Sequence, residues 1–94
     1  MTEIWEYVLI ATDRQVIEMP KGAEVLSVQV QRDQLCLWVR VVPEAPLIEK
    51  EIAIVGTGHP CGFEVDRFIG TVQMTSESLV FHVFEVKDGI TSES

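Results

Sequence analysis

Apolar and polar residues alternate along most of this chain, and no stretch repeats apolar residues with the helical period of 3.6. In residues 23–31, AEVLSVQVQ, the apolar side chains of Leu26, Val28 and Val30 share one face of an extended strand. Residues 35–42, LCLWVRVV, continue the alternation after the tight connection RDQ. The two runs therefore predict a β-hairpin.

The same patterning predicts seven strands, over residues 4–10, 15–20, 23–31, 35–42, 51–56, 67–75 and 79–86. Residues 43–50 hold two prolines, which exclude a central strand, so we expect a loop there. The last run, LVFHVFEV, is apolar on both faces, which is typical of a strand that is central between two layers or buried at a subunit contact. The predicted fold class is all-β, with about seven short, mostly antiparallel strands in a small sandwich or barrel.

Ninety-four residues suffice for one domain. We expect a single β domain over residues 1–87 and a flexible polar tail over residues 88–94. A content of 47% hydrophobic residues is high for so short a chain, so part of the apolar surface should remain exposed. Large exposed apolar patches mark interfaces, which favours a homo-oligomer.

The net charge of −8 narrows the classes of partner. The seven basic residues are scattered, whereas nucleic-acid binding needs clustered Lys and Arg, so we expect no direct contact with DNA or RNA. The first residues are acidic where a secretory leader is basic, and no apolar run approaches a membrane span. We therefore expect a cytoplasmic protein in which Cys36 and Cys61 are free thiols.

The segment Ile54–Phe63, IVGTGHPCGF, breaks the β pattern. Its glycines permit positive φ angles and close approach of the backbone, and successive N–H groups in such a turn can form an anion-binding nest. Thr57 adds a hydroxyl and His59 an imidazole. The alternative is a glycine-rich turn that only reverses the chain between two strands.

Catalytic and metal chemistry find little support in the sequence. Four residues, Cys36, His59, Cys61 and His82, have the types of a Cys2His2 zinc site, but their spacing fits no zinc motif. No third residue is placed to orient a Cys61–His59 pair, and no two carboxylates can be paired. We expect no enzyme activity, no metal and no cofactor.

Three blocks of the chain carry a resemblance. They are IEMPKGAEVLSVQVQRDQLCLWVRV, IVGTGHPCG, and FIGTVQM followed by LVFHVFEV, within residues 17–86. In these blocks the sequence resembles a family of small proteins of unknown function encoded by bacteriophages and prophages. The resemblance implies a β-rich fold, action in the cytoplasm of an infected bacterium, and a motif rather than a random loop at Gly56–Pro60.

Two classes of function fit such a protein. The first is a non-enzymatic binder of a small anionic ligand, most concretely a sponge that sequesters a nucleotide immune signal in counter-defence. The expected ligand-binding residues are Gly56, Thr57, Gly58 and His59, with Arg67 for charge and Trp38 for stacking.

The alternative is an acidic inhibitor that binds a host defence or nucleic-acid enzyme, as anti-CRISPR proteins do, or a structural phage accessory protein. An inhibitor would present carboxylates to a basic groove of its host partner, and the candidates are Glu44, Glu49, Glu51, Glu64 and Asp66.

Overall fold

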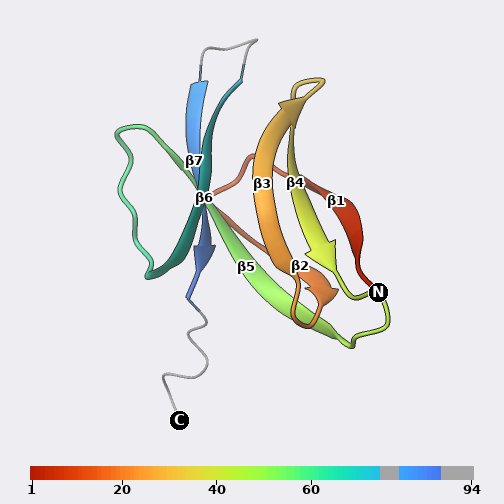
Figure 1. Cartoon of the computed structure of the whole chain (residues 1–94). Coiled ribbons are helices and arrows are strands. Elements are labelled where there is room, and N and C mark those ends of the chain that lie inside the picture. Colours follow the sequence, from red (N-terminus) through yellow and green to blue (C-terminus); the bar gives the residue numbers. More distant parts are fainter. Residues whose placement is uncertain (75–78, 88–94) are drawn as a thin grey trace.

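The computed structural model describes residues 1–74 and 79–87 as two antiparallel β-sheets packed in a sandwich-like arrangement (Figure 1). The three-stranded sheet has the order β1-β4-β3, and the four-stranded sheet has the order β2-β5-β7-β6. The strands are β1 (Glu3–Leu9), β2 (Arg14–Pro20), β3 (Glu24–Gln31), β4 (Gln34–Val41), β5 (Leu47–Gly56), β6 (Val65–Met74) and β7 (Leu79–Val86). The predicted all-β fold of about seven strands is confirmed.

The predicted hairpin is β3–β4, closed by a two-residue turn. Arg32 and Asp33 have φ angles of 52° and 63°, as a type I′ turn requires at both central positions. A register shift lies between Val25 and Ser27, so Leu26 is an extra residue and is exposed. The predicted inward face of Leu26, Val28 and Val30 was therefore wrong at Leu26, because the bulge turns Val25 into the core in its place.

Strand β5 begins at Leu47, so the prediction of a loop over residues 43–50 was wrong for its last four residues. Pro46 precedes the strand rather than interrupting it, and its carbonyl accepts the N–H of Lys21 at 2.8 Å. Residues 47–50 then pair with residues 17–20 of β2. Strand β5 is longer than predicted because it pairs with β2 along the whole length of β2, from Arg14 to Pro20.

Strand β7 lies between β5 and β6 in the four-stranded sheet, and its two apolar faces have different surroundings. Val83 is fully buried towards the three-stranded sheet. On the other face, the ring of Phe84 contacts those of Phe63 and Phe68, with centroids 5.7 and 5.4 Å apart. The inner face of β7 is thus buried at Val83, whereas Val80, His82 and Phe84 on the outer face stay partly exposed.

The two sheets meet closely along β3 and β6. Gly70 of β6 lies against Val28 of β3, and a Cβ atom at position 70 would stand 3.0 Å from Val28 Cγ1. The missing side chain allows this approach. Strands β1 and β2, at the opposite edges of the two sheets, are not paired with each other.

The expected turn at residues 76–78 and the expected tail over residues 88–94 lie outside the described residues. In the described part of the chain, no helix is long and apolar enough to cross a membrane.

Candidate functional site

The glycine-rich segment begins with a tight turn after β5. The N–H of His59 donates to the carbonyl of Gly56 at 3.0 Å, which closes a four-residue turn. Gly58 has a φ of +90°, close to the value of about +80° at the third residue of a type II turn. Only glycine adopts this conformation without strain, so Gly58 is explained by the turn.

Gly56 has a different reason to be glycine. A Cβ atom at this position would stand 3.2 Å from Cδ2 of His59, so the imidazole ring lies directly against the backbone of Gly56. The N–H of Thr57 donates to the carbonyl of Val80 at 3.3 Å. The N–H groups of Thr57 and His59 are therefore both bonded to carbonyls and cannot also hold an anion.

The Thr57 hydroxyl contacts a histidine rather than open space. Its oxygen lies 2.8 Å from Nε2 of His82, and the hydroxyl of Thr71 lies 3.0 Å from Nδ1 of the same ring. In hydrolases a nucleophilic hydroxyl contacts a histidine base in the same way, and a carboxylate orients the histidine ring. Here the group that orients the His82 ring is the hydroxyl of Thr71 instead of a carboxylate. The two threonines fasten the loop to β7 and β6 through His82.

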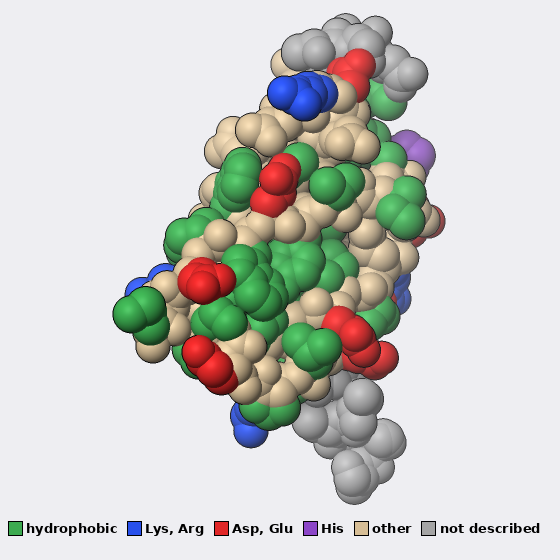
Figure 2. All heavy atoms as spheres, turned by 90° about the vertical axis from the view of Figure 1, so that its right-hand side faces the viewer, with side chains coloured by type: hydrophobic (Ala, Val, Ile, Leu, Met, Phe, Trp, Pro, Cys, Tyr) green, Lys and Arg blue, Asp and Glu red, His purple; other side chains and the backbone are tan. Residues whose placement is uncertain are grey.

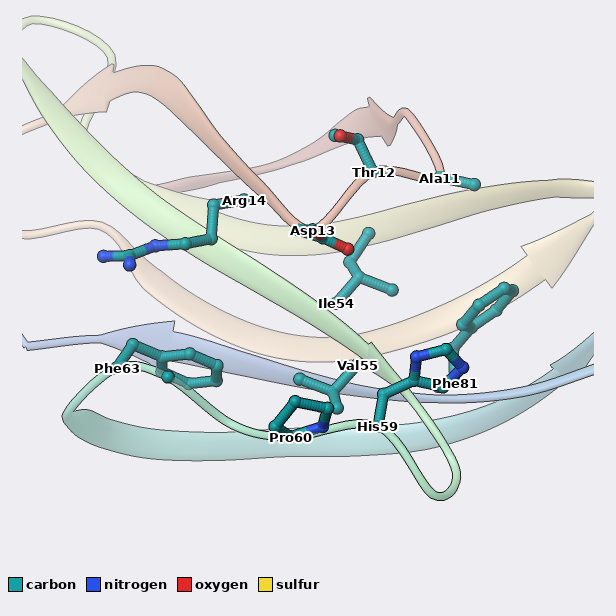
Figure 3. A pocket seen from close by; sticks show the side chains of 12 residues that line it. Ala11, Thr12, Asp13, Arg14, Ile54, Val55, His59, Pro60, Phe63 and Phe81 are labelled. Carbon is teal, nitrogen blue, oxygen red and sulfur yellow. The ribbon is translucent and has the colours of Figure 1, made fainter.

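A hollow of 490 Å³ lies between the β1–β2 turn and this loop. We call it the loop hollow. Its polar lining comes from Thr12, Asp13, Arg14 and His59, and its larger apolar lining comes from Ala11, Ile54, Val55, Pro60, Phe63 and Phe81, with Gly56 and Gly62. In Figure 3, Arg14 and Phe63 lie at one end of the hollow and His59 and Phe81 at the other.

Arg14 is held in place at its end of the hollow. Its Nε donates to Glu51 Oε2 at 2.7 Å, and this hydrogen bond raises the pKa of Arg14 above its ordinary value. The guanidinium carbon lies 5.7 Å from the centroid of the Phe63 ring. The ion pair is largely exposed, so it orients the guanidinium more than it stabilises the fold.

The structure brings together only part of the residue set expected from the sequence. Gly56 and His59 line the loop hollow, and Thr57 and Gly58 lie in the turn beside it. Arg67 is elsewhere, where it and Lys50 contact the carboxylate of Glu85 at 3.3 and 3.0 Å. Trp38 lies on β4 in the other sheet and does not line the hollow.

Sequence reasoning missed Asp13, Arg14 and Phe81 as lining residues. Residues 11–14 lie between two predicted strands, and nothing in their composition points to a hollow 40 residues further along the chain. The available signal was the isolated pair Asp13-Arg14 beside a strand end, which is too common to select a site.

The two thiols differ in exposure. Cys36 is buried, and burial, together with Glu6, raises the pKa of its thiol. Cys61 is exposed in the glycine-rich loop. Over residues 1–74 and 79–87, no three His, Cys, Asp or Glu side chains gather closely enough to hold a metal ion.

Comparison with known proteins gives a family and no activity. No curated protein and no solved structure matches the chain. A family model described as a domain of unknown function, DUF7352, matches residues 1–93. Because the match covers nearly the whole chain, the protein belongs to the DUF7352 family.

Proposed function

We propose that this protein is a non-enzymatic binding protein that holds a small ligand with a flat ring and an anionic group in the loop hollow. The observation that carries the proposal is the hollow itself, with its apolar lining and its few polar groups. Its volume of 490 Å³ falls in the range of about 300–1,000 Å³ that small-molecule sites occupy. Nucleotide-type ligands combine the two required features.

The lining suggests how such a ligand would lie. The rings of Phe63 and Phe81, with Pro60, offer apolar surface to a base. The ion pair with Glu51 uses Nε of Arg14, so the terminal amino groups of the guanidinium are the part that would meet a phosphate. His59 would add a second donor.

The charges of the chain restrict the ligand. A net charge of −8 repels anions at long range, and Asp13 lines the same hollow. Binding must therefore come from short contacts, and charge-assisted hydrogen bonds contribute about 1.5–3 kcal/mol each. Arg14 is the one guanidinium among the lining residues, so it would pair with one phosphate group of the ligand.

Within this class, the finer proposal is a phage protein that sequesters a nucleotide immune signal in the host cytoplasm. It is supported by the sequence resemblance to phage-encoded proteins and by analogy with small oligomeric sponges.

The test is calorimetry against cyclic dinucleotides, cyclic ADP-ribose derivatives and nucleoside monophosphates. We expect Arg14→Gln combined with His59→Ala to weaken binding by at least about tenfold. Arg40→Gln is the matched control, because Arg40 makes an exposed ion pair of the same 2.7 Å length with Glu24 on the other sheet. Thr57→Ala should retain affinity, since Thr57 does not line the hollow.

Two results would contradict the proposal. Absence of binding across the panel would remove the nucleotide class. A ligand recovered in altered form after denaturation would contradict a non-enzymatic role and direct attention to the Thr57–His82 pair.

A further inference from the structure

A second hollow of 570 Å³ lies on the opposite side of the molecule, at the free edge of β1. We call it the edge hollow. It is lined by Ile4, Trp5, Glu6, Tyr7, Glu18 and Leu47, which come from β1, β2 and the start of β5. Figure 2 shows this side as an apolar patch with carboxylates around it.

The apolar surface comes from side chains that the sandwich covers only in part. Trp5 and Tyr7 share the inner face of β1 with Leu9, which is buried, but both remain half-exposed. Burial raises the pKa of Tyr7, so this ring is partly withdrawn from water. Ile4 and Leu47 beside them are 55% and 61% exposed.

The backbone of β1 is available for pairing along this edge. The turn Arg32-Asp33 makes Gln31 and Gln34 a hydrogen-bonded pair, because that pair closes a two-residue hairpin. Hydrogen bonding alternates along a strand, so Gln34, Cys36, Trp38 and Arg40 direct their N–H and C=O groups towards β3. The residues between them bond to β1, through Glu3, Trp5, Tyr7 and Leu9.

The remaining residues of β1 therefore direct their backbone groups away from β4. These are Ile4, Glu6 and Val8. The side chain of Gln15 supports the assignment, because it bonds both backbone groups of Ile10, the next residue of the same parity, at 3.1 and 2.7 Å. The three N–H and three C=O groups of these residues thus point outwards along the edge hollow, where an added strand could pair with them.

The charges around the hollow are negative and uncompensated. The ion pairs of the described residues engage Glu24, Glu51 and Glu85, and none involves Glu6, Glu18 or Glu49. Glu18 and Glu49 stand directly opposite each other in the β2–β5 register. Like charges in such a pair are destabilising, so a cation between them would be favoured.

We propose that the edge of β1 is a docking site for an extended segment of a partner protein in which apolar residues alternate with Lys or Arg. The segment adds as a fourth strand to the three-stranded sheet. Its apolar side chains cover Trp5 and Tyr7 on the inner face of β1, and its basic side chains meet the carboxylate of Glu6 on the outer face. Main-chain bonds supply affinity, and alternate side chains supply selectivity.

A second copy of this chain fits the edge less well. Antiparallel pairing of two β1 strands through Ile4, Glu6 and Val8 places Glu6 opposite Glu6 of the other copy. Each copy also carries a net charge of −8. The repulsion favours a basic segment over self-association.

The test uses a fluorescein-labelled peptide with the sequence Lys-Val-Lys-Val-Lys-Val-Lys, and its Glu-Val counterpart as the control. Anisotropy should show binding of the basic peptide and none of the acidic one. Val8→Pro removes an edge N–H and keeps the ladder to β4, so binding should weaken by at least about tenfold. Val16→Pro is the matched control, because Val16 is similarly exposed and its N–H faces the outer edge of β2.

The charge contribution is tested separately. Glu6→Lys should weaken binding of the basic peptide by at least about tenfold. Glu64→Lys makes the same change of charge in the loop on the other side of the molecule and should leave affinity within about twofold.

Hydrogen exchange keeps the proposal falsifiable if a proline variant fails to fold. In the wild-type protein, the bound peptide should slow exchange at the amides of Ile4, Glu6 and Val8. Binding without this protection, or equal loss of affinity in Val8→Pro and Val16→Pro, would overturn strand addition at β1. A dimer that protects the same amides without peptide would show that the occupant is a second copy, and it would overturn the proposal.

Discussion

The two sheets are packed differently at the two long sides of the sandwich. Along β3 and β6 the sheets touch, because Gly70 admits Val28 within contact distance. Along β1 and β2 the sheets part, and Trp5 and Tyr7 are left half-exposed between them. The first side has a glycine at the contact between the sheets, whereas the second side has two large aromatic rings. The predictions below test the contacts at the closed side and the free backbone groups at the open side.

The largest effect is expected at the closed side. Gly70→Leu should destabilise the protein by about 1–3 kcal/mol, because the new side chain enters space that Val28 already fills. Urea unfolding measures the change. Gly62→Ala is the control, since a Cβ atom at position 62 meets nothing within 4 Å and should cost little.

A double variant sharpens this result. If the contact with Val28 is responsible, Val28→Ala should cost less in the Gly70→Leu background than in the wild type. Additive costs would show that Gly70 is needed for another reason.

A smaller effect is expected where the open side begins. Gln15→Leu should cost about 0.5–1.5 kcal/mol, because the amide that bonds both backbone groups of Ile10 is lost. Thermal unfolding measures the difference, and Gln73→Leu on the exposed face of β6 serves as a control. No loss of stability would mean that water replaces the amide fully.

The last prediction concerns the wild-type protein and needs no substitution. In the free protein, the amides of Ile4, Glu6 and Val8 should exchange hydrogen faster than those of Trp5 and Tyr7, which bond to β4. Nuclear magnetic resonance measures each amide separately. Uniform protection along β1 would show that its outer edge is already paired.

The fold was predictable where it depends on local pattern. Alternation predicted the hairpin that β3 and β4 form, and the runs of apolar residues predicted all seven strands. The bulge at Leu26 was not predictable, because an inserted residue changes which side chains face inward without changing their apolar character. The start of β5 was missed because its partner is β2, which is distant in the sequence.

The candidate site was predictable only in part, for a related reason. The glycine-rich segment indicated a backbone with positive φ angles, and Gly58 has one. Gly56 and His59 line the loop hollow. Composition could not show that Thr57 bonds His82 or that Arg67 bonds Glu85, since each contact joins residues that are distant in the sequence. Arg14 was missed because the opposite wall of the hollow comes from the β1–β2 turn.

The amide of Gln15 has a consequence for any strand that adds to β1. By occupying the N–H and the C=O of Ile10, it ends the free ladder two residues after Val8. An incoming segment can pair with Ile4, Glu6 and Val8 and then must turn away. Gln15 would therefore limit the length of an added strand, because the paired stretch can extend only from Ile4 to Val8. Exchange of this one side chain for a residue without an amide would lengthen the segment that the protein accepts.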